Sequence, residues 1–149
     1  MPKSRSSPRH SKSPKRVSRS PKPQKESKSS SVTKFVSTLF NSREQAHILH
    51  LQTNSYSKHK ALQKFYEGIV PLVDTYIETY QGKYGLIKGY TPASRFQEGT
   101  KAVIPYFKDL EKKISGMKDK LPKDLDLENA YADILQLIHS TNYLLNYLH

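Results

Sequence analysis

The sequence predicts an all-α protein, a four-helix bundle that follows a basic N-terminal tail. Two observations predict this fold. From residue 32 onward, apolar side chains recur every three or four positions, and no segment shows the alternation that strands require. The composition also changes there, because residues 1–31 hold 10 Lys and Arg against one acid, 11 Ser and 5 of the 9 Pro. We therefore expect the two regions to differ in structure.

Residues 1–31 are expected to form a disordered tail, and residues 32–149 a single helical domain. The tail supplies +9 of the net charge of +12 and contains no Phe, Tyr, Leu or Ile. Such a segment cannot bury enough apolar surface to offset the entropy lost on ordering. The remainder carries 15 basic and 12 acidic side chains and is long enough for one hydrophobic core.

Composition excludes several classes of protein. The chain has no cysteine, so disulfides, thiolate zinc sites and cysteine nucleophiles are excluded. No apolar run is long enough for a transmembrane helix, and no apolar segment follows the N-terminal charges as in a secretory signal. We therefore expect an intracellular protein without a membrane partner, located in the cytoplasm, the nucleus or nucleoid, or a virion.

The first two helices are predicted from their caps and apolar faces. The first should start after a cap near Ser31–Thr33 and end near Gln52, and the second should run over about Ser57–Tyr80 with Gly82 as its C-cap. Pro71 should kink the second helix. Their apolar faces comprise Val32, Phe35, Val36, Leu39, Ala46 and Leu49 in the first, and Leu62, Phe65, Tyr66, Ile69, Leu72, Val73, Tyr76 and Tyr80 in the second.

The last two helices follow a loop over residues 81–92, which contains three glycines. The third is either one helix interrupted at Pro105, or a short helix over 93–103 and a longer one from Pro105. Asp124 or Asp126 should cap the fourth. Their apolar faces comprise Phe96, Thr100, Val103, Phe107, Leu110, Ile114, Met117 and Leu121, then Leu127, Tyr131, Ile134, Ile138, Thr141, Leu145 and Leu148.

Four side chains form a candidate metal site: His47, His59, Asp74 and Glu78. Imidazole and carboxylate ligands suit iron and its neighbours in the first transition row. Asp74 and Glu78 are one turn apart and point away from the apolar face of their own helix. They cannot easily meet the histidines of the same chain, but they can meet those of a second subunit. His50 lies deeper on the apolar face and competes with His47, although it also suits a hydrogen-bonded core position.

The stretch from Glu44 to Glu78, EQAHILHLQTNSYSKHKALQKFYEGIVPLVDTYIE, resembles the ferroxidase segment of the Dps proteins, the ferritin-like DNA-protecting proteins of starved cells. The resemblance implies a ferritin-like bundle that forms at least a dimer. It implies that His47 and His59 of one subunit bind iron together with Asp74 and Glu78 of its two-fold partner. Oxidation of Fe²⁺ by peroxide or oxygen is the implied activity.

The tail is the candidate nucleic-acid contact, through its ten basic residues: Lys3, Arg5, Arg9, Lys12, Lys15, Arg16, Arg19, Lys22, Lys25 and Lys28. A flexible polycation binds a polyanion by displacing counterions, with little sequence preference. Dps proteins often carry a similar tail that holds DNA. Ser7, Ser13 and Ser20 each precede proline and suit proline-directed kinases. A linker or a nuclear-targeting segment is the alternative.

Other interpretations stay open. Glu44 and His47 form a Glu-x-x-His pair as in di-iron bundles, although a second pair is absent. Glu67, Asp74 and Glu78 equally fit a solvated helix face. The chain is also reminiscent of uncharacterised small helical proteins of phages and large DNA viruses. This favours a second hypothesis, a non-catalytic nucleic-acid-binding or genome-packaging protein that keeps the bundle and the tail.

Overall fold

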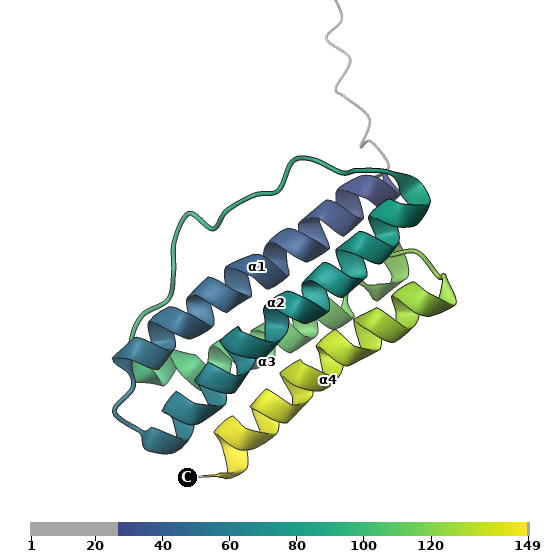
Figure 1. Cartoon of the computed structure of the whole chain (residues 1–149). Coiled ribbons are helices and arrows are strands. Elements are labelled where there is room, and N and C mark those ends of the chain that lie inside the picture. Colours follow the sequence, from purple (N-terminus) through teal and green to yellow (C-terminus); the bar gives the residue numbers. More distant parts are fainter. Residues whose placement is uncertain (1–26, 149) are drawn as a thin grey trace, which may run out of the picture.

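The computed structural model describes residues 27–148, which form four α-helices and no strand. The helices are α1 (Lys28–Gln52), α2 (Tyr56–Tyr84), α3 (Val103–Ser115) and α4 (Leu125–Tyr147), with 3₁₀ turns at Thr100–Ala102 and Lys118–Lys120. The prediction of an all-α domain with four helices is confirmed for these residues. They pack as a bundle in which α1 lies on α2, α2 on α4, and α3 on α4 (Figure 1). None of the helices within 27–148 has the length and apolar character needed to cross a bilayer.

One long crossover orders the bundle. Residues 85–99 leave the end of α2 and run back along α1 before α3 begins (Figure 1). As a result, α2 and α3 point in the same direction, and so do α1 and α4 (Figure 1). The predicted loop over 81–92 begins too early, because α2 continues to Tyr84. It also ends too early, because the next helical element starts only at Thr100.

Polar side chains of α1 hold the crossover in place. Asn41 donates through Nδ2 to the carbonyl of Thr91 (3.0 Å), and its Oδ1 accepts from the Ala93 amide (2.8 Å). Gln45 does the same for Gln97, donating to its carbonyl (2.7 Å) and accepting from its amide (2.6 Å). These side chains satisfy backbone groups that a helix or strand would otherwise pair. The crossover therefore stays extended.

The start of α1 corrects the predicted boundary. The helix begins at Lys28, not near Ser31–Thr33, so residues 28–31 belong to the folded body rather than to the tail. Ser27 caps it, because its Oγ accepts from the Ser30 amide (3.2 Å). Thr33, deeper in the helix, also donates to the carbonyl of Lys88 in the crossover (3.4 Å). The predicted apolar face of α1 is fully buried.

The C-terminus of α2 also differs from prediction. Its C-cap is Gly85 rather than Gly82, and Gly85 has a φ of 85°, which a residue with a side chain rarely adopts. The helix continues through Pro71 without a break, with Pro71 exposed and Thr75 donating to its carbonyl (2.9 Å). Of the predicted apolar face, all but Tyr66 and Leu72 are buried, and those two are half-buried.

The third helix is the main error. No helix covers residues 93–99, and α3 starts at Val103 and includes Pro105 in its first turn, so neither predicted arrangement is right. Phe96 lies in the crossover and is 37% exposed. In α4 the N-cap is Asp124, one of the two predicted residues, and the predicted apolar face is buried except Leu148.

Candidate functional site: a histidine cluster at the α1–α2 turn

Three of the predicted metal ligands meet where α1 turns into α2. His47 and His50 come from the last turns of α1, and His59 comes from the first turns of α2. We call these three residues the histidine cluster. The connection between the helices is short, and Ser55 caps α2 by accepting from the Lys58 amide (3.4 Å). This tight turn brings residues 9 positions apart into contact.

His50 and His59 form a reciprocal pair. The two rings are stacked with their centroids 3.7 Å apart. Nδ1 of His50 bonds the carbonyl oxygen of His59 (2.9 Å), and Nδ1 of His59 bonds the carbonyl oxygen of His50 (3.3 Å). Because a carbonyl oxygen can only accept, each Nδ1 must carry the proton. In the neutral rings, both Nε2 atoms therefore keep a free lone pair.

Tyr66 packs against the histidine cluster. Its ring stacks on His47 with centroids 4.5 Å apart and meets His50 edge-on at 5.2 Å. The guanidinium of Arg43 lies 6.0 Å from the centre of the Tyr66 ring. His50 is buried, as its place on the apolar face predicted, whereas His47 and His59 are half-buried. The sequence analysis placed Tyr66 only in the hydrophobic core. Tyr66 lies seven residues, or two helical turns, after His59, and this spacing could have identified it as a neighbour of the histidines.

Asp74 and Glu78 lie elsewhere in the same chain. They are 15 and 19 residues beyond His59 on one continuous helix. At the rise of an α-helix these separations are about 22 and 28 Å. Both carboxylates are exposed and point away from the core as predicted, and neither pairs with a cation of the described residues. One protomer therefore does not bring them to the histidines.

The remaining acidic candidates have other partners. Glu67 is exposed and accepts a hydrogen bond from Gln63 (2.9 Å). Glu44 forms an ion pair with its neighbour Arg43. Neither carboxylate has a histidine partner among the interactions of residues 27–148.

The chemistry of the histidine cluster fits a transition-metal ion in part. Metal-binding histidines usually donate their second ring N–H to a backbone carbonyl or carboxylate, which fixes the ring and leaves the other nitrogen for the metal. His50 and His59 have this arrangement. Within residues 27–148 of a single protomer, however, no three His, Asp or Glu side chains are grouped to hold a metal ion.

The predicted nucleic-acid residues lie almost entirely outside the described part of the chain. Only Lys28 falls within it, as the exposed first residue of α1. The other nine precede residue 27.

Comparison with known proteins identifies a family. A family of unknown function, DUF5856, matches residues 50–145, which is more than half of the chain. The chain belongs to this family. The matched region contains His50, His59, Asp74 and Glu78, whereas His47 and the tail precede it. No curated protein and no solved structure matches the chain.

Proposed function

We propose that the chain is a Dps-like, ferritin-like protein that binds Fe²⁺ between two subunits, oxidises it, and associates with DNA through its basic tail. The observation that carries this proposal is the pair His50–His59. Its rings are held by backbone carbonyls in the orientation that leaves each Nε2 free. Two further features of the molecule support it.

The first is the connectivity of the bundle. Two helical hairpins joined by one long crossover are characteristic of ferritin-like bundles, whereas up-down-up-down bundles use short loops throughout. Residues 85–99 make such a crossover, and it runs the length of α1 (Figure 1). The histidine cluster and the carboxylates lie on α1 and α2, the hairpin that precedes the crossover.

The second is the spacing along α2. Residues that face each other across a two-fold axis between antiparallel helices have numbers with a constant sum. Pairing His59 with the partner's Glu78 places the axis one to two residues before Val70. Tyr66 stacks on His47 and therefore marks the level of His47 along α2. Pairing Tyr66 with the partner's Asp74 places the two-fold axis at Val70. The two positions agree within about 2 Å of helix rise.

An apolar patch lies at that level of the bundle. Val70 on α2, Phe40 on α1 and Tyr90 in the crossover border a hollow of about 530 Å³. Phe40 is 36% and Tyr90 43% exposed, and their rings meet edge-on at 6.4 Å. Exposed aromatic side chains are enriched at the centres of subunit interfaces. We propose this patch as the centre of the dimer contact.

In this proposal iron is the substrate. Peroxide accepts one electron from each of two Fe²⁺ ions and, with two protons, leaves as two waters. The imidazoles bind Fe²⁺ through Nε2, and the partner's Asp74 and Glu78 offset the charge of the ferric product. Removing Fe²⁺ and peroxide together limits the formation of hydroxyl radicals near DNA.

The test uses complementation between subunits. His59→Asn keeps a nitrogen donor near the position of Nδ1 but removes Nε2, and Asp74→Asn removes a carboxylate at an exposed position. Each variant alone should fail to form ferric absorbance from stoichiometric Fe²⁺ and peroxide. After the two variants are mixed, dissociated and reassembled, about a quarter of the wild-type activity should return, since half of the dimers then hold one intact site of two.

His139→Asn and Asp133→Asn are the matched controls. Both residues are exposed on α4 and outside the proposed site. Each control should retain wild-type oxidation. Oxidation by the His59 and Asp74 variants at the wild-type rate, or no recovery in the mixture, contradicts a shared site.

The charge of the tail favours a second candidate, a non-catalytic nucleic-acid-binding or genome-packaging protein. Residues 1–27, which precede α1, carry +8, whereas the rest of the chain carries only +4. In that case the protein retains DNA in a salt-sensitive manner and its iron oxidation does not depend on His59 or Asp74. The complementation experiment separates the two candidates.

A further inference from the structure

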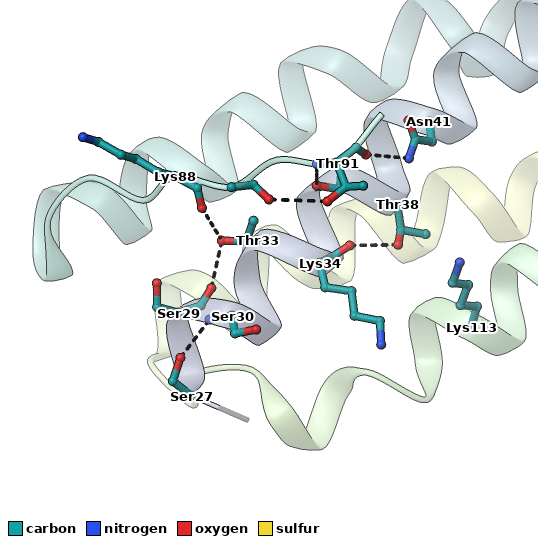
Figure 2. Close-up of a pocket in the computed structure, with 12 residues that line it drawn as sticks. Ser27, Ser29, Ser30, Thr33, Lys34, Thr38, Asn41, Lys88, Thr91 and Lys113 are labelled. Carbon is teal, nitrogen blue, oxygen red and sulfur yellow. Dashed lines mark hydrogen bonds between the residues drawn. The ribbon is translucent and has the colours of Figure 1, made fainter. Parts of the chain in front are cut away.

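A lysine-lined groove opens at the other end of α1 (Figure 2). It measures about 670 Å³ and lies between the first half of α1, the crossover and α3. Lys34 of α1, Lys88 of the crossover and Lys113 of α3 contribute its three charged side chains. We call this feature the lysine groove.

Every charge on the lining of the lysine groove is positive. No carboxylate lines it, and its other side chains are mainly hydroxyls and one amide. Lys34, Lys88 and Lys113 are exposed, and none of them forms an ion pair with a carboxylate among residues 27–148. The ammonium group of Lys88 extends away from those of Lys34 and Lys113 (Figure 2), so the cationic groups at the hollow itself come from α1 and α3 and have no protein counterion among residues 27–148. An anion would neutralise them.

The short third helix keeps the groove open. α3 has 13 residues, whereas α1 has 25, and the two touch at few points. A second hollow of about 470 Å³ continues the groove along α1, with Asn41 and Lys113 bordering both. This continuation adds Arg95 and one carboxylate, Asp109. The combined groove is therefore elongated and net positive.

The tail joins the folded body at the lysine groove. Ser27, the cap of α1, lines it directly, and the 26 residues that precede Ser27 carry nine of the ten basic residues of the tail. The unmodified tail would be repelled by the groove, because both are cationic. A polyanion bound by the tail is instead brought to the groove. Lysine and hydroxyl donors are the groups that commonly contact phosphate oxygens of nucleic acids.

We propose that the lysine groove binds the sugar–phosphate backbone of the DNA that the tail captures. This inference rests on the DNA-binding part of the proposed function and is independent of iron. The tail supplies capture without fixed geometry, and the groove fixes the position of the bundle on the DNA.

The test compares two triple variants of the full chain. The groove variant removes three positive charges from the lysine groove through Lys34→Gln, Lys88→Gln and Lys113→Gln. The control variant removes three positive charges from exposed positions toward the histidine cluster through Lys60→Gln, Lys64→Gln and Lys101→Gln. Affinity for a short DNA duplex is measured from low to physiological salt. Because each phosphate contact contributes about 0.9 to the slope of log affinity against log salt, the groove variant should lose about 2–3 units of slope.

The control variant should keep a slope within about one unit of wild type. Equal slopes for the two triple variants would overturn the groove and leave tail binding intact. No salt-sensitive binding by the wild-type chain would overturn the groove and the DNA-binding part of the proposed function together. Iron oxidation should be the same in both variants, so failure of the iron proposal is read separately. The lysines are exposed, and an unchanged melting temperature confirms that both variants are folded.

Discussion

The two ends of α1 differ in almost every physical property. At its start, the lysine groove is open, cationic and lined with hydroxyls. Near its end, the histidine cluster is aromatic and closely packed, with His50 only 7% exposed. Lys34 and His50 are 16 residues apart on one helix, which corresponds to about 24 Å. The comparison shows how one helix can separate the proposed anion-binding region from the proposed metal-binding region.

The two regions are also built differently. The histidine cluster depends on a short turn and on hydrogen bonds to backbone carbonyls, so its geometry is local. The lysine groove depends on three segments that are distant in sequence. Damage to tertiary packing should therefore affect the groove more than the cluster. Three predictions test this difference, in order of decreasing effect.

Phe107→Ala should have the largest effect. Phe107 is fully buried in α3 and meets Phe65 of α2 edge-on at 4.8 Å. Truncating a buried phenylalanine costs about 3–5 kcal/mol of unfolding free energy. Since Lys113 is on the same helix, the variant should also lose part of the DNA salt slope, while the NMR signals of the histidine cluster stay unchanged.

Phe96→Ala is the matched control, because Phe96 is 37% exposed in the crossover. It should cost less than about 1 kcal/mol in chemical denaturation. Similar losses for the two variants would show that α3 is not held through Phe107.

His50→Ala should have an intermediate effect, confined to the other end. It removes the ring that stacks on His59 and the hydrogen bond from that ring to the His59 carbonyl. The net contribution of one hydrogen bond to the free energy of unfolding is about 0.5–1.5 kcal/mol. His50→Asn keeps a nitrogen donor near the same place and should lose less, as measured by urea unfolding. If both variants match wild type, the reciprocal pair contributes nothing to stability.

The smallest effect should come from acid acting on the groove end of the bundle. There Lys83 on α2 bonds Asp126 (2.7 Å) and Asp124 (3.4 Å) at the start of α4, and the Tyr84 hydroxyl donates to Asp124 (2.7 Å). These hydrogen bonds lower the pKa of both carboxyls below their ordinary value of 3.8. The main cause is the bond from Tyr84 for Asp124 and the bond from Lys83 for Asp126.

A lowered pKa in the folded state means that this contribution is complete above pH 3.8 and is lost as the pH falls through the folded-state values. The effect is small because Lys83 and Asp126 are exposed and Asp124 is only half-buried, so solvent screens their charges. Urea midpoints from pH 6 to pH 2 should fall less steeply for Lys83→Met than for wild type, whereas Lys60→Met should follow wild type. Parallel curves for Lys83→Met and wild type would contradict a role for these contacts.

Much of the fold could be predicted from the sequence. The apolar faces of α1 and α4 follow helical spacing because burial there is decided by local periodicity. The crossover could not be predicted in the same way. Phe96 and Thr100 continue the spacing of α3, but the segment before residue 100 is extended. Its backbone is bonded by Asn41 and Gln45, about 50 residues earlier, and local patterns contain no sign of such partners.

The candidate site was predictable to a similar extent. Helical spacing placed His50 on the buried face and turned Asp74 and Glu78 toward solvent. The carbonyl contacts of His50 and His59 depend on the exact path of the turn between α1 and α2, which residue types do not specify. The lysine groove left no sequence signal, since its three lysines come from three separate segments.

The central claim is that each iron site is formed by residues of two subunits. Native mass spectrometry of the full chain, loaded with Fe²⁺ without oxygen, measures assembly size and bound iron together. We predict dimers or larger even-numbered assemblies with two iron-binding sites per dimer, and loss of iron without loss of assembly in Asp74→Asn. A monomer that binds no iron would contradict the claim.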